Sequence, residues 1–139
     1  MLARMRAAVT VAACALVVAL AGCGGDEEEE ESASGLADEA AAVVEQLERS
    51  IAAGEFARIC SELLSAEVRR QAGGGDCPAQ LERTSAGVRR PRIEVTEIRI
   101  EGAEAAVDVV TTAQGQERAA DTIKLVREAG GYRISSLSG

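Results

Sequence analysis

Apolar residues in the first half of the folded region recur at intervals of three and four, which is the spacing of one helix face. The first stripe predicts a helix that ends at Gly54 and consists of Leu36, Ala40, Val43, Val44, Leu47 and Ile51. The second consists of Phe56, Ile59, Cys60, Leu63 and Leu64, with Val68 after a break at Ser65. Asp76 as a cap and Pro78 in the first turn predict a third, short helix with Leu81 and Val88 as its apolar contacts.

From Ile93 onwards the period changes to two, which predicts strands. The first strand carries the β-branched residues Ile93, Val95, Ile98 and Ile100. Their alternation slips by one near Glu97, which predicts a bulge. Three more strands follow: one over 103–109, one from about 118 to 127, and a last one that contains Tyr132, Ile134 and Leu137. Turns are expected at 101–102, 114–116 and 130–131. Helices followed by a meander predict an α+β domain with three N-terminal helices packed on one face of a curved, four-stranded antiparallel sheet.

The first 22 residues have the character of an export signal. Arg4 and Arg6 precede an apolar run over 7–21, which is shorter than the about 20 residues that span a bilayer. The run ends in Leu20-Ala21-Gly22-Cys23, which resembles the lipobox of bacterial lipoproteins. The resemblance implies cleavage before Cys23, lipidation of its thiol, and an acyl anchor on the extracytoplasmic side of the cell membrane. The alternative is an ordinary cleaved signal peptide with an incidental Cys23.

The distribution of charge separates an acidic segment, 23–35, from the rest of the chain after the signal. The whole sequence has 15 basic and 23 acidic residues and no His. Six acids form the run 26–31 in a segment, 23–35, that has no apolar side chain larger than Ala apart from Cys23 itself. Such a segment predicts a flexible, extended tether, so the domains are expected at 1–22, 23–35 and 36–139. The acidic balance excludes a basic footprint for nucleic acid.

Of the four cysteines, Cys14 lies in the signal segment and Cys23 in the lipobox. The remaining pair, Cys60 and Cys77, is expected to form a disulfide in an oxidising compartment. A helix from Cys60 to Gln71 and an extended return after the glycine run 73–75 cover similar distances. Two buried free thiols and a metal pair are the alternatives. A zinc site lacks ligands, because the chain has neither His nor a CxxC spacing.

The order of elements resembles the nuclear transport factor 2-like superfamily, the cone-shaped fold that includes ketosteroid isomerase and polyketide-cyclase relatives. Two segments carry the resemblance: Gly54-Glu55-Phe56-Ala57 through Cys60-Ser61-Glu62-Leu63-Leu64-Ser65, and Ile123-Lys124-Leu125-Val126-Arg127 through Gly130-Gly131-Tyr132-Arg133-Ile134. The resemblance covers about residues 36–137. It implies a pocket between helices and sheet, which enzymatic relatives line with Asp, His or Tyr.

In this chain the candidate pocket residues are Asp108, Asp121, Tyr132 and Phe56. A buried carboxylate among them would have a raised pKa and could act as a general base. The alternative is that Asp108 and Asp121 are solvated and that Tyr132 belongs to the core. Arg89, Arg90 and Arg92 at a helix–strand joint favour a solvated surface over contact with an anionic lipid or glycan.

The leading functional expectation is a non-catalytic module that binds a small apolar ligand or an envelope protein, with a homodimer through the sheet as one arrangement. A polyketide-cyclase or isomerase-like lyase and a structural envelope protein are the alternatives. The sequence has no motif for a metal or an organic cofactor, and its glycine run lacks the Lys-Ser/Thr of a phosphate loop.

Overall fold

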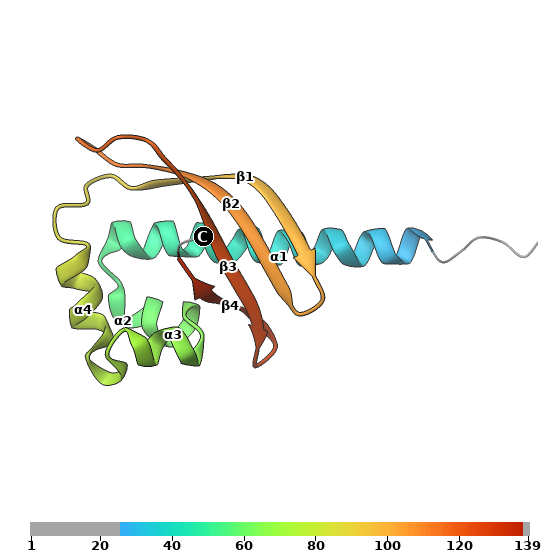
Figure 1. Cartoon of the computed structure of the whole chain (residues 1–139), viewed down its shortest axis with the longest axis horizontal. Coiled ribbons are helices and arrows are strands. Elements are labelled where there is room, and N and C mark those ends of the chain that lie inside the picture. Colours follow the sequence, from blue (N-terminus) through green and yellow to red (C-terminus); the bar gives the residue numbers. More distant parts are fainter. Residues whose placement is uncertain (1–25, 138–139) are drawn as a thin grey trace, which may run out of the picture.

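The computed structural model describes residues 26–137, and these form an α+β fold in which helices precede an antiparallel sheet (Figure 1). The predicted signal peptide, Cys14 and the predicted lipidation site Cys23 lie outside these residues. Within residues 26–137, no helix combines the length and the apolar character that crossing a bilayer requires.

Helix α1 (Asp26–Ala53) begins well before the apolar stripe that predicted it. The acidic segment was expected to be extended, but its backbone is helical from Asp26 on. Glu is a good helix former, and acidic residues in the first turns offset the helix dipole. These local preferences account for the difference. The first turns of α1 project past the strands, and the rest of the helix runs across the sheet (Figure 1).

The second predicted helix is divided. It consists of α2 (Phe56–Arg58), a π-helical turn η1 (Ile59–Leu63) and, after Ser65, α3 (Ala66–Gln71). Ser65 has an extended backbone, and its hydroxyl accepts a hydrogen bond from the Val68 amide at 3.2 Å. This is an N-cap, so a new helix begins there. The expectation of three simple helices is therefore not confirmed.

The third predicted helix is α4 (Cys77–Thr84), which follows the 3-10 turn η2 (Gly74–Asp76). Pro78 lies in its first turn as predicted, whereas Asp76 makes no side-chain cap. Val88 lies beyond the end of α4, half-buried in the loop that leads to the sheet.

The four strands are β1 (Arg92–Glu101), β2 (Glu104–Thr112), β3 (Ala119–Glu128) and β4 (Gly131–Ser136). They form an open antiparallel sheet in the order β1-β2-β3-β4. The register shifts between Val95 and Glu97, which confirms the predicted bulge. Leu137 was expected in the last strand, but it follows β4 and is 44% exposed. Its side chain therefore contributes little to the core.

The core lies between α1, η1 and one face of the sheet. It consists mainly of Ala40, Val44, Leu47, Ile59, Leu63, Leu64, Ala105, Val107, Val109, Ile123, Leu125, Tyr132 and Ile134. Leu64 and Ile134 form an isolated parallel bridge, and the Ser65 amide donates to the Ile134 carbonyl at 2.9 Å. The helical segment thus closes part of the outer edge of β4.

Two carboxylates of α1 hold the two edge strands. Glu48 accepts a hydrogen bond from the Ile93 amide of β1 at 2.6 Å. Glu39 accepts one from the Tyr132 amide of β4 at 3.3 Å and pairs with Arg127 at 3.1 Å. Amides at sheet edges otherwise need water or another chain as acceptor. These contacts fix α1 across the sheet.

The hairpin between β3 and β4 turns through Ala129 and Gly130, one residue earlier than the sequence predicted, because Gly131 already pairs with Glu128. Both turn residues have positive φ, 45° for Ala129 and 84° for Gly130. This is the type I′ arrangement, which favours Asn-Gly and disfavours a residue such as Ala at the first position.

We expect Ala129→Asn to stabilise the protein by about 0.5–1 kcal/mol, because Asn tolerates this backbone conformation better than Ala. Chemical denaturation monitored by circular dichroism measures the change. Ala103→Asn is the matched control, because Ala103 also lies in a hairpin turn but lacks a positive φ. An equal gain in both variants would contradict the conformational explanation.

Candidate functional site

Asp108, the first predicted pocket residue, lies on the sheet face opposite the helices. Its carboxylate accepts two hydrogen bonds from the Arg99 guanidinium, at 2.5 and 3.1 Å, and one from the Thr122 hydroxyl at 2.8 Å. The bonds from Arg99, and then the one from Thr122, hold the pKa of Asp108 below its usual range. A carboxylate with a lowered pKa and all these donors is a weak base.

Asp121 lies on the other face, the face of Ile123 and Leu125, since it pairs with buried Val109. It is nevertheless exposed. The last pair between β3 and β4 is Lys124 with Ser136, so this end of β3 has no strand on its outer side. The Asp121 carboxylate is therefore solvated rather than buried.

Tyr132 belongs to the core, which was the alternative to a pocket role. It is 3% exposed, and the Arg127 guanidinium carbon lies 5.1 Å from its ring centroid. Its buried hydroxyl has no hydrogen-bond partner among the described residues. Phe56 is half-buried at the margin of the core.

These four residues do not form one site. Asp108 lies on the outer face, Asp121 at an exposed sheet end, and Tyr132 with Phe56 on the helix side. The depression that contains both aspartates, about 490 Å³, is lined by neither aromatic residue. The general-base alternative requires a carboxylate buried beside Tyr132, and neither Asp108 nor Asp121 meets this requirement.

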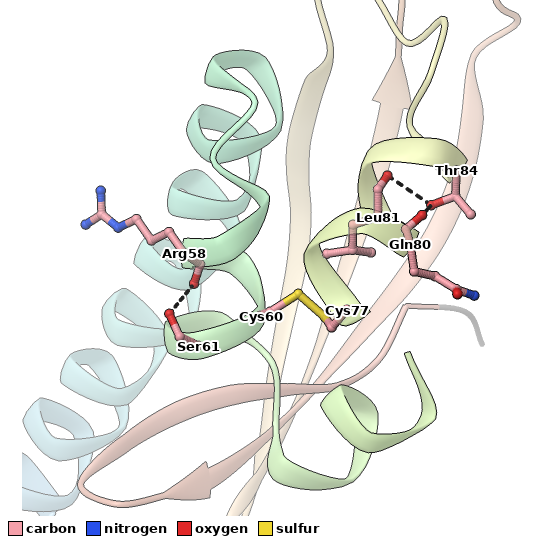
Figure 2. The surroundings of a disulfide bond; sticks show 7 residues. All are labelled: Arg58, Cys60, Ser61, Cys77, Gln80, Leu81 and Thr84. Atoms are coloured by element: carbon pink, nitrogen blue, oxygen red, sulfur yellow. Dashed lines mark hydrogen bonds between the residues drawn. A yellow bond between two sulfur atoms is a disulfide. The ribbon is translucent and has the colours of Figure 1, made fainter. Parts of the chain in front are cut away.

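Cys60 and Cys77 are joined by a disulfide that links η1 to the first turn of α4 (Figure 2). Both residues are buried, at 4% and 0% exposure. Buried sulfurs are poorly accessible to thiolates that would exchange with them. The bond is therefore part of the structure rather than a reactive centre.

A groove at the open end of the sheet is the feature that the sequence did not predict. Its floor is a row of three residues paired across three strands, Ile93, Thr111 and Ala119. Ile51 from the end of α1 and the loop residues Val88 and Pro91 also line it. We call this feature the end groove, and it encloses about 230 Å³. It forms because α1 ends at Ala53 and because Thr111 and Ala119 are too small to fill the space left by the helix.

Two charged residues, Arg92 and Glu117, line the end groove, and three more arginines lie next to lining residues in the sequence. Arg92 lines it and pairs with Glu48 at 3.4 Å, and Arg118 pairs with Glu94 at 3.8 Å. Arg89 and Arg90 stand between the lining residues Val88 and Pro91. The sequence identified Arg89, Arg90 and Arg92 as a group but could not place them beside a cavity.

The described residues hold no group of three or more Cys, Asp or Glu side chains that could bind a metal ion. No protein family matches the chain, and no curated protein matches it either.

Proposed function

We propose that this chain is a lipid-anchored protein on the extracytoplasmic side of a bacterial cell membrane, and that its folded domain binds a small apolar ligand without catalysing a reaction. The motif Leu20-Ala21-Gly22-Cys23 supports the anchor. The Cys60–Cys77 disulfide supports an oxidising compartment.

The end groove is the observation that carries the ligand-binding part. Small-molecule sites are concave, mostly apolar and equipped with a few polar groups. Ile51, Val88, Pro91 and Ile93 give the end groove its apolar lining, and the hydroxyl of Thr111 is a polar group on its floor. Its volume of about 230 Å³ is below that of a site for a drug-sized molecule, so the ligand is small.

A lyase of the polyketide-cyclase type remains the enzymatic alternative that the fold resemblance raised, but none of the contacts of Asp108, Asp121 and Tyr132 favours it. Binding of an envelope protein, a purely structural role and a homodimer through the outer sheet face also remain predictions. Sedimentation velocity at several concentrations tests the homodimer.

We expect cells fed with radiolabelled palmitate to incorporate the label into this protein and to lose it when Cys23 is replaced by Ala, since the thiol is the proposed acceptor. The protein should then leave the membrane fraction. Cys14→Ala is the matched control, because that cysteine lies in the segment that is removed. Label that persists without Cys23, or that is absent from the unaltered protein, contradicts the anchor.

Ligand binding is tested on the chain from Gly24 to Gly139, which contains every core residue and is exported through a cleavable signal without a lipobox. A thermal-shift screen of small uncharged apolar compounds should give hits that raise the melting temperature. The same hits should have no effect on Ala119→Leu, which places bulk on the floor of the end groove. Hits that act equally on both proteins bind elsewhere and contradict the proposal.

A further inference from the structure

The end groove differs from a plain apolar pocket in the charges at its rim. Arg92 and Arg118 each have an acidic partner, whereas neither Arg89 nor Arg90 makes an ion pair or a side-chain hydrogen bond with any described residue. The domain as a whole is acidic, because the arginines are outnumbered. One carboxylate, that of Glu117, lines the groove and forms no ion pair with any described residue. The two unpaired guanidinium groups still outnumber it on an otherwise acidic surface.

The backbone holds the two arginines next to the end groove. The Arg89 carbonyl accepts a hydrogen bond from the Gln114 amide at 2.8 Å. Gln114 follows Ala113, which lines the groove. The loop that carries the arginines is thus fastened to the β2–β3 connection. Their flanking residues Val88 and Pro91 line the groove as well.

Arg90 also adopts a backbone conformation that costs free energy. Its φ is 51°, in the left-handed region, and it precedes a proline, which disfavours helical backbone angles further. A non-glycine residue in this region often marks a functional position, because surrounding contacts must maintain it. The unpaired charge and the strained backbone occur at the same residue.

Resting on the proposed function, we propose that the ligand of the end groove is a small amphipathic anion, such as a medium-chain carboxylate. Its apolar part lies on the row Ile93, Thr111 and Ala119, and its charged group meets Arg89 and Arg90 at the rim. Guanidinium groups bind carboxylates through two parallel hydrogen bonds. A cation at the same position would meet two positive charges against the one carboxylate of Glu117, so the groove favours anions as well as small ligands.

The test is a titration of ¹⁵N-labelled protein, residues 24–139, followed by amide chemical shifts. The three probes share one apolar chain and differ in the head group: octanoate, octan-1-ol and octylamine. We expect octanoate to bind most tightly and to shift the amides of Ile93, Thr111 and Ala119. Replacing both arginines (Arg89→Gln/Arg90→Gln) should weaken octanoate binding about tenfold and leave octan-1-ol unchanged.

Two matched controls separate the groove from general effects. Arg69→Gln/Lys124→Gln removes two other exposed charges for which no ion pair is formed, so octanoate binding should not change. Ala119→Leu should abolish binding of octanoate and octan-1-ol, whereas Ala120→Leu, on the other face of β3, should abolish neither. Melting temperatures of all variants establish that they are folded.

The outcomes distinguish this inference from the proposed function. If octan-1-ol binds in the end groove and octanoate binds no more tightly than octylamine, the anionic ligand is wrong and the apolar site stands. If none of the probes shifts the groove amides, both the inference and the site under the proposed function are overturned. Equal weakening of octanoate in the two charge-removed variants also overturns the role of Arg89 and Arg90.

Discussion

Replacing both Cys60 and Cys77 by Ala is expected to lower the free energy of unfolding by about 3 kcal/mol. The cross-link joins positions 17 apart in the sequence, and in the chain-entropy treatment closing a loop of about this length removes that much conformational freedom from the unfolded chain. For a domain of this size the loss corresponds to a fall in melting temperature of about 15 °C. Differential scanning calorimetry measures both quantities.

Ser61→Ala is the control for this prediction, because Ser61 lies next to Cys60, is exposed, and makes one weak hydrogen bond of 3.4 Å to the Arg58 carbonyl. It should change the melting temperature little. The unaltered protein with a reductant should approach the behaviour of the double variant. An unchanged melting temperature in the double variant would show that the packing of η1 against α4 suffices without the bond.

Replacing Ile134 by Ala is expected to destabilise the protein by about 2–5 kcal/mol. Ile134 is completely buried, pairs with buried Leu125, and bridges to Leu64 of the helical segment. Removing its side chain leaves a cavity where the sheet meets the helices. Because close-packed neighbours relax only partly into such a cavity, the loss exceeds the transfer free energy of the deleted carbons.

Leu137→Ala is the matched control in the same terminal segment, since that side chain is 44% exposed. It should cost less than about 0.5 kcal/mol, as is usual for surface changes. Urea denaturation of both variants separates the two sites. Similar losses at the two positions would mean that the core does not end at Ile134.

The strands could be predicted from the sequence because alternation has a period of two and β-branched residues reinforce it. The slip near Glu97 even located the bulge. The end of the last strand was mispredicted because Leu137 is apolar, although it is out of phase with Tyr132 and Ile134, and pairing with β3 stops at Ser136. Burial at that point depends on the length of the partner strand and on the helices beneath.

The helices were harder to predict than the strands, because the same apolar spacing is compatible with an α-helix, a π-helical turn or a broken helix. The residues from Phe56 to Leu64 fit one helix by spacing, but they divide between α2 and a π-helical turn. The capping role of Ser65 was visible only as a break. The helical start of α1 was missed because the prediction rested on the repulsion of the acids and the lack of apolar side chains and left out the helix propensity of Glu.

The candidate site was the least predictable part. Asp108 and Asp121 occupy adjacent strands, but parity places them on different faces, Asp108 half-buried against Arg99 and Thr122 and Asp121 in solvent. The end groove is formed by Ile51, Val88, Ile93, Thr111 and Ala119, which are far apart in the chain and individually ordinary. Such a cavity forms where a helix ends above small side chains. Neither feature produces a recognisable motif in the sequence.

The length of α1 has a consequence for how an anchored protein would meet its surroundings. From Asp26 to Ile51 the helix rises about 38 Å at 1.5 Å per residue. If Cys23 carries the acyl chains, the anchor precedes the first residue of this helix in the sequence, whereas the end groove lies by its last turn. The length of the helix would then separate the groove from the anchor, so a ligand would enter from the aqueous space rather than from the lipid leaflet.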